Sequence, residues 1–221
     1  MSDCPTPAPL APQTLERIRL REAEILGKPP RVETVDRLAR ADEILEATDR
    51  LRASLFGNVS SLSIEQVPQI MVTMLPFGTL WERIMGLSMT VMGPASRLAR
   101  RDQKLAILRT GWLLQAPYEF GEHVHQSKAL GITTDEIERI TAEGSASPLW
   151  SEHERAVLRC AEQLQARASV DDETWDVLSR TLDTEQIFEL IVLIGQFTLV
   201  AYFQNALRLP LEAGNPGLAA R

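Results

Sequence analysis

The stretch RDQKLAILRTGWLLQAPYEFGEHVH, residues 101–125, decides the fold of this chain. Leu105, Leu108 and Trp112 recur at intervals of three and four residues, which is the spacing of one face of an α-helix. Pro117 suits the first turn of a second helix, because the N–H that proline lacks would have no helical partner there. The stretch therefore predicts two consecutive helices joined by a short turn.

Helix signals recur along the rest of the chain, and strand signals hardly occur. Capping residues stand before apolar patterns of helical period, and glycines or prolines follow them; Ser151 is one such cap, and Asp183 or Thr184 is another. Pro68 falls within the third expected helix, which could begin there instead. The expected helices are residues 15–26, 31–56, 63–75, 77–92, one from about 99, 117–130, 135–142 with Thr134 as its cap, 152–167, one from about 172, and 184–208. The chain is therefore expected to be all-α.

The composition excludes several classes of protein. The chain has 221 residues, and its 23 Lys and Arg against 30 Asp and Glu give a net charge of −7. A nucleic-acid binder or a polybasic membrane anchor needs a surplus of cations to neutralise phosphate groups. We therefore expect no nucleic-acid or membrane partner, and one sizeable core at this length.

The two cysteines and the apolar segments favour a soluble, cytoplasmic protein. Cys4 lies in a proline-rich start that does not resemble a signal peptide, and Cys160 falls in a helical pattern, where a small buried hydrophobic residue is expected. They form no disulfide framework or zinc motif. Residues 187–203 are apolar, but Glu189 and Gln196 interrupt them, and a bilayer span needs ~20 apolar residues. We expect a core or subunit-interface helix there.

The densest group of titratable residues lies in the helix that begins at Pro117. Glu119 and His123 are four residues apart, so their side chains share a helix face and a carboxylate could hold the imidazole for proton transfer. The same spacing is also common in surface ion pairs. Glu122 and His125 form a second possible pair on another side of the helix, and no second motif supports a metal site.

Six segments of the chain carry a resemblance to a known family: Arg101–Arg109, Ala116–His123, Gly131–Thr133, Ser151–Ala166, Tyr202–Leu207 and Leu209–Leu211. They resemble the carboxymuconolactone decarboxylase family, whose superfamily also contains the AhpD-type alkylhydroperoxidases. The resemblance covers residues 63–211 and implies an AhpD-like helical bundle, assembled as trimers or hexamers with sites near subunit interfaces. We therefore expect a helical N-terminal arm over residues 1–62 and a domain over 63–221.

The chain departs from the family patterns at two places, and these departures indicate which branch of the superfamily it resembles. The peroxidase branch carries Cys-x-x-Cys-x-x-x-His, and aligning its histidine with His123 places Ala116 and Glu119 at the cysteine positions, so a thiol peroxidase is not expected. The family commonly has a glutamate where this chain has Lys104. That lysine could pair with a substrate carboxylate, could be a solvated surface residue, or could mark a lost activity.

The resemblance and the residues together predict a cofactor-independent lyase, similar to a decarboxylase, on a small carboxylated, enol or lactone substrate. His123, held by Glu119, would transfer the proton, and Tyr118 would donate a hydrogen bond to an enolate oxygen. Lys104 or Arg109 would bind the carboxylate. Trp112 would form an apolar wall, and Asn205 is a candidate only through the resemblance.

Several alternatives remain open from the sequence. Arg109 could make an ordinary ion pair, and Trp112 could simply pack in the core. A hydratase, dehydratase or isomerase could use the same acid–base pair. An oligomeric binding protein without enzymatic activity could keep the fold and lose the chemistry.

Overall fold

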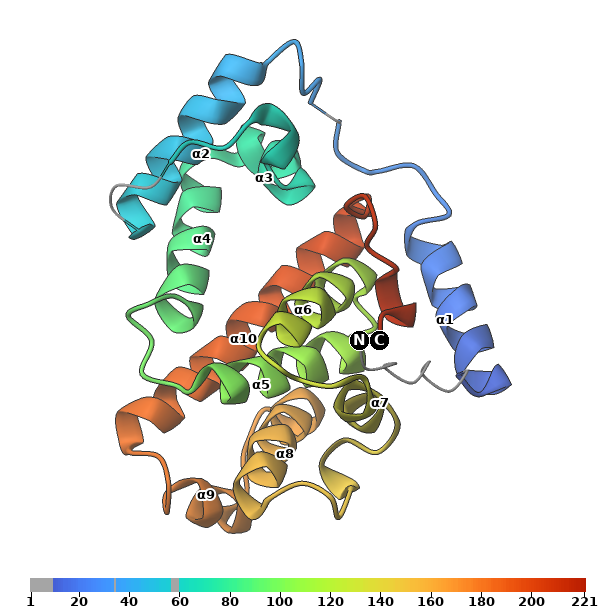
Figure 1. Ribbon diagram of the computed structural model, residues 1–221, viewed down its shortest axis with the longest axis vertical. Coiled ribbons are helices and arrows are strands. Elements are labelled where there is room, and N and C mark those ends of the chain that lie inside the picture. The colour runs from blue at the N-terminus through green and yellow to red at the C-terminus, as the bar shows by residue number, and fades with distance from the viewer. Residues whose placement is uncertain (1–9, 34, 57–59) are drawn as a thin grey trace, which may run out of the picture.

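Every regular element in the described part of the chain is a helix, as the sequence predicts (Figure 1). The computed structural model describes residues 10–33, 35–56 and 60–221. The α-helices are α1 (Pro12–Ile25), α2 (Ala41–Phe56), α3 (Gln69–Met74), α4 (Gly78–Met92), α5 (Arg100–Leu113), α6 (Pro117–Ala129), α7 (Thr134–Ala142), α8 (Glu152–Arg167), α9 (Asp172–Leu178) and α10 (Thr184–Leu207), and the short 3-10 turns are η1 (Ile64–Gln66), η2 (Leu75–Phe77), η3 (Gly144–Ala146) and η4 (Gly217–Ala219).

Helices with strong start signals begin where the sequence predicts. Helix α8 follows the capping box of Ser151 and Glu154, and α6 begins at Pro117. Asp183 caps α10 by accepting from the backbone N–H of Gln186. The predicted cap of α7 was wrong by one residue, because Thr133 makes the capping box instead of Thr134.

Two predicted helices near the N-terminus were too long. The helix expected over 31–56 begins at Ala41 as α2, because the backbone N–H of Arg31 donates to the carbonyl of Leu207 at 2.9 Å and ties that segment to the end of α10. Asp36 then accepts from two following backbone amides in a turn. The helix expected over 63–75 is divided into η1 and α3, with Pro68 as the N-cap of α3.

The main core forms where α5 packs against α6, α8 and α10. Leu105 and Leu108 of α5, Phe120 of α6, Leu158 of α8 and Leu190 of α10 are fully buried there. Helices α5, α6 and α10 lie side by side in Figure 1, and α4 contacts α10 farther along the same helix. This arrangement brings α4, α6 and α10 around one cavity.

Helix α10 is long and apolar enough to cross a membrane by length and composition, with 24 residues and a mean hydropathy of 1.7 over its most apolar window. Its Ile187, Leu193 and Phe197 side chains are nevertheless buried against neighbouring helices. It therefore occupies the position expected of a core helix.

Both described helices of the N-terminal arm pack against the rest of the chain. Helix α1 places Ile18 in the main core, and Glu22 of α1 accepts from the backbone N–H of Leu218 at 2.8 Å. Helix α2 packs on α3 and α4 through a separate small cluster that contains Ile44 and Val72. The domain boundary near residue 63 stays a prediction.

The cysteine predictions can be checked at one of the two positions. Cys160 is fully buried in α8, and burial raises the pKa of its thiol to about 12. This confirms Cys160 as a small buried hydrophobic residue. Cys4 lies outside the described residues.

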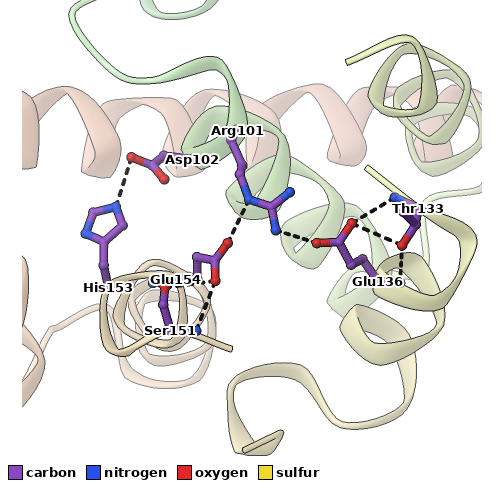
Figure 2. A network of polar contacts seen from close by, with 7 residues as sticks. All are labelled: Arg101, Asp102, Thr133, Glu136, Ser151, His153 and Glu154. Atoms are coloured by element: carbon purple, nitrogen blue, oxygen red, sulfur yellow. Dashed lines mark hydrogen bonds and ion pairs between the residues drawn. The ribbon is translucent and has the colours of Figure 1, made fainter. Parts of the chain in front are cut away.

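A polar network joins the N-terminal ends of α5, α7 and α8 (Figure 2). Arg101 of α5 contacts Glu136 and donates to Glu154 at 2.7 Å, and those two glutamates belong to the capping boxes of α7 and α8. His153 of α8 lies between Asp102, at 3.0 Å, and the Thr181 hydroxyl, at 2.7 Å. His153 lies in the N-terminal turn of α8 and links this helix to α5 and to the segment that follows α9.

Candidate functional site

A cavity of about 190 Å³ lies between α4, α6 and α10. Its wall is mostly apolar, and Met85, Met89 and Met92 of α4 contribute to it. Glu119 and His123 of α6 supply titratable side chains to this wall. The lining residues are Pro68, Ile70, Trp81, Met85, Ser88, Met89, Met92, Tyr118, Glu119, Glu122, His123, Gln126, Phe197, Val200 and Gln204.

Glu119 lies in the first turn of α6, and its carboxyl group is buried without a partner. The residue is 2% exposed, and neither carboxyl oxygen has a hydrogen-bond partner among the described residues. Gly111 of α5 makes room for the carboxyl group, since a Cβ at that position would lie 3.3 Å from Oε1. Burial raises the pKa of Glu119 well above its usual value. Glu119 is therefore positioned to carry a proton near neutral pH.

His123 lies one helical turn after Glu119 and is also buried. Its ring packs edge-on against Phe197 of α10, with the ring centres 4.9 Å apart. Its Nδ1 atom lies 3.0 Å from Nζ of Lys104. Burial, with a smaller contribution from the Lys104 charge, lowers the pKa of His123 well below its usual value. The imidazole is therefore neutral near pH 7.

Lys104 extends from α5 and is 4% exposed, so the interpretation as a solvated surface residue was wrong. Its Nζ donates to Oε1 of Gln126 at 2.7 Å, in addition to contacting His123. Burial and the nearby charge of Arg100 lower its pKa to about 8. Lys104 is not among the residues that line the cavity, and it lies behind His123.

The contact between Lys104 and His123 defines the tautomer of the imidazole. A protonated lysine has only donors, so Nδ1 of His123 must accept from it. The ring proton of the neutral imidazole is then on Nε2. The expected pairing of His123 with Glu119 is not observed, because the described contacts include no hydrogen bond between them.

Tyr118 lines the cavity, but its hydroxyl group already has two partners. It donates to Glu212 and accepts from the backbone N–H of Ile70 at 3.3 Å. Burial and the neighbouring Glu212 carboxylate raise the pKa of Tyr118. The hydroxyl group therefore anchors α3 and the C-terminal segment to α6.

The other expected substrate-binding residues lie outside the cavity lining. Arg109 donates to Glu162 at 2.8 Å and to the carbonyl of Ile140 at 2.6 Å. Trp112 packs against the core residue Phe120, with the ring centres 5.3 Å apart. The structure thus shows the ion pair and the core packing that the sequence left as alternatives for Arg109 and Trp112.

Asn205 likewise does not line the cavity; its Nδ2 lies 3.4 Å from the carbonyl of Leu114. In the second expected pair, His125 is exposed and Glu122 accepts a hydrogen bond from Asn215 at 2.9 Å. Among the described residues, no group of three His, Cys, Asp or Glu side chains is arranged to hold a metal ion.

Two further cavity residues carry unpartnered polar atoms that the sequence does not predict. Trp81 of α4 and Gln204 of α10 both line the cavity, and the indole Nε1 and the amide Oε1 have no partner within the described residues. Both residues stand in apolar helical patterns that resemble ordinary core positions. The sequence therefore contains no local signal that separates them from packing residues.

Solved structures share the fold of this chain. No family model and no curated protein matches the sequence. The AhpD core of a peroxidase-related protein from Ralstonia eutropha aligns with a TM-score of 0.65 and 14% identity, over 84% of this chain and 94% of that one. A protein of unknown function from Agrobacterium tumefaciens, suggested to be the antioxidant defence protein AhpD, aligns with a TM-score of 0.56 and 22% identity over 61% of this chain and 91% of its own.

The third neighbour is an enzyme with a bound ring compound. A cysteine-to-alanine variant of the debrominase Bmp8, in complex with 2,3,4-tribromopyrrole, aligns with a TM-score of 0.61 and 18% identity over 82% of this chain and 91% of its own. These similarities show that the chain has the AhpD-like fold.

Proposed function

We propose that this AhpD-like chain is a cofactor-independent acid–base enzyme that decarboxylates a small substrate with a conjugated carbonyl group, such as an enol or a lactone. One observation carries the proposal. Glu119 is buried with both carboxyl oxygens unpartnered among the described residues, and it lines the same apolar cavity as the neutral His123. A polar group buried without a partner costs free energy, and such groups are characteristic of sites that bind a ligand.

The proposed reaction needs a proton donor and a group that stabilises negative charge. The bond between the substrate and its carboxylate breaks, CO₂ leaves, and the electron pair remains as a dienolate. The Nε2–H group of His123 donates to the dienolate oxygen. The protonated carboxyl group of Glu119 gives its proton to the substrate carbon, and solvent then restores the proton on Glu119. The net reaction consumes one proton and releases one CO₂.

Lys104 is a positioning residue in this proposal, because it acts through His123. Its contact at 3.0 Å keeps the imidazole proton on Nε2. The ammonium charge behind the ring also favours negative charge on a group that accepts from Nε2. A carboxylate in the same place would accept from Nδ1–H and leave Nε2 as an acceptor. A glutamate at position 104 would therefore move the ring proton from Nε2 to Nδ1. The substrate would then meet an acceptor at Nε2 in place of a donor.

No cysteine among the described residues lines the site, which supports acid–base chemistry over peroxide reduction. Ala116 and Glu119 stand at the two positions that the peroxidase motif gives to cysteine. Cys160, the cysteine within the described residues, is buried in α8 and does not line the cavity. The tribromopyrrole bound to the debrominase supports a ring-sized ligand for this fold. We further propose a cytoplasmic location and a homo-oligomer.

The experiment is a screen of small cyclic carboxylates in D₂O, with the products analysed by mass spectrometry. Loss of CO₂ with one deuterium on the product carbon supports the proposal. Glu119→Gln and His123→Ala should each lower turnover at least about 100-fold. His125→Ala is the matched control, since this exposed imidazole lies on the same helix. Gain or loss of water without CO₂ would instead identify a hydratase or dehydratase, and unchanged turnover in both variants would remove the assigned roles.

A further inference from the structure

Trp81 of α4 and Gln204 of α10 both line the cavity and share an unusual property. Each residue is 4% exposed. The indole Nε1–H of Trp81 is a donor, the amide Oε1 of Gln204 is an acceptor, and neither atom has a partner among the described residues. With the Glu119 carboxyl group, three buried side chains on α4, α6 and α10 bring unpartnered polar atoms to the lining of one cavity.

These atoms are costly to the folded protein unless a ligand pairs with them. A buried donor or acceptor that makes no hydrogen bond costs the free energy of its desolvation. An apolar residue of the same size would avoid this cost. Trp81 has its ring packed edge-on to Phe203, at 6.0 Å between ring centres, so the indole is held in place by packing rather than by its N–H. The N–H is therefore free for another partner.

We propose that Trp81 and Gln204 recognise the ligand of this cavity. The ligand is then a small ring that carries an acceptor atom for the Trp81 N–H and a hydroxyl or ring N–H group for the Gln204 carbonyl. This inference takes the cavity of the proposed function as its site and adds the class of ligand. The acceptor can be the carbonyl or carboxylate oxygen that the proposed reaction requires.

The size and the wall of the cavity limit the ligand further. An apolar cavity of about 150 Å³ holds a benzene molecule, so about 190 Å³ suits one ring with one or two small substituents. Met85, Met89 and Met92 recur at helical spacing on α4 and line the cavity. Their flexible, polarisable side chains pack well on the face of an unsaturated ring. The exposed Gln126 also lines the cavity, which gives a ligand a way in.

Three probes with a single benzene ring distinguish the proposed contact with Trp81 from the proposed contact with Gln204. Phenol offers a donor and an acceptor, anisole offers an acceptor alone, and toluene offers neither. Binding to the full chain is measured by titration calorimetry or ligand-detected NMR, without turnover. The unchanged protein should bind phenol most tightly and toluene least tightly. Because binding is measured without reaction, the result is independent of whether the proposed decarboxylation is correct.

The variants then assign the contacts to residues. Trp81→Phe should weaken phenol and anisole about tenfold and leave toluene within about twofold. Gln204→Met should weaken phenol about tenfold and leave anisole within about twofold. Met85→Leu is the matched control, because it changes the apolar wall and should shift all three probes together. A thermal melt of each variant verifies that it is folded.

Several outcomes would overturn the inference. Toluene could bind the unchanged protein as tightly as phenol does, or none of the probes could bind at millimolar concentration. The preference for phenol could also persist in both variants. The first two outcomes are read from the unchanged protein alone, so they hold even where a variant does not fold.

Discussion

Nζ of Lys104 lies 3.0 Å from Nδ1 of His123, and this contact joins two consecutive helices at the wall of the cavity. Lysine donates and cannot accept while it is protonated. The contact therefore decides which nitrogen of His123 carries the proton. The sequence spacing predicts that Glu119 holds the imidazole of His123. In the structure Lys104 contacts the ring instead.

The first prediction concerns the tautomer of His123. At pH 7 the ring should be neutral with its proton on Nε2, because burial and the Lys104 charge keep its pKa low. Lys104→Met should remove the constraint and give a mixture of tautomers. The measurement is the pair of ¹⁵N chemical shifts of the His123 ring. Lys128→Met, on an exposed position of α6, should leave both shifts unchanged.

The pH provides a second test of the same contact. The pKa of Lys104 is lowered to about 8, so the lysine loses its proton as the pH rises through that range. A neutral amine can donate or accept, so the tautomer should relax with an inflection near pH 8 in the unchanged protein. A ring that carries its proton on Nδ1 at pH 7 would contradict the interpretation.

The second prediction is that Glu119→Gln stabilises the fold. The pKa of Glu119 is raised by burial, so the native state holds its proton while the unfolded state releases it above about pH 4.5. The free energy of unfolding therefore falls as the pH rises from the pKa of Glu119 in the unfolded state toward its pKa in the native state. The free energy of unfolding of Glu119→Gln should exceed that of the unchanged protein by on the order of 1–3 kcal/mol at pH 7.5.

Urea denaturation at several pH values measures this effect. The difference between Glu119→Gln and the unchanged protein should shrink as the pH falls to about 4. Glu46→Gln, on an exposed position of α2, should show no such trend. A variant that is less stable at pH 7.5 would indicate that Glu119 has a stabilising partner in the native protein.

The fold was predictable where local signals decide the structure. The capping box of Ser151 and Glu154 and the proline at 117 fix helix starts by local hydrogen bonds and backbone geometry. The segment 31–40 was misjudged because its conformation depends on a distant partner, the end of α10, to which Arg31 is tied. Helical periodicity alone contains no information about such a contact.

The candidate site was predictable only within one helix. Glu119 and His123 could be found because they lie four residues apart on α6. Lys104 was noticed as a departure from the family pattern, but its contact with His123 depends on how α5 packs against α6. Trp81 and Gln204 meet the cavity from helices that are distant in sequence, so only the packed structure places them there.

The third prediction concerns His153, which lies away from the cavity. Its pKa is raised, first by its hydrogen bond with Asp102 and also by that residue's charge. Stabilisation from the protonated histidine is fully present below its unfolded pKa of about 6.5 and is lost as the pH rises through the folded pKa. His153→Ala should therefore cost about 1 kcal/mol at pH 5.5 and less at pH 8.5.

The measurement is urea denaturation at these two pH values. His125→Ala serves as the control, since His125 is exposed and belongs to a different helix from His153. A cost of His153→Ala that does not change with pH would mean that packing and the Thr181 contact, rather than the charge, hold this residue.

The fourth prediction is that α10 joins copies of this chain. Phe188, Leu199 and Tyr202 are exposed on α10, and at 100° per residue they fall in one stripe together with the exposed Gly195. An exposed stripe of large apolar side chains marks a contact surface. The resemblance to a family of trimers and hexamers points to a second copy as its occupant.

Light scattering after size exclusion measures the assembly. The unchanged chain should form a trimer or hexamer, and Leu199→Glu should shift it to smaller species, because burying an unpaired carboxylate in the contact is costly. Leu149→Glu is the matched control, since Leu149 is also an exposed leucine but lies outside α10. A monomeric unchanged chain, or an assembly that survives Leu199→Glu together with Phe188→Glu, would exclude this stripe as the interface.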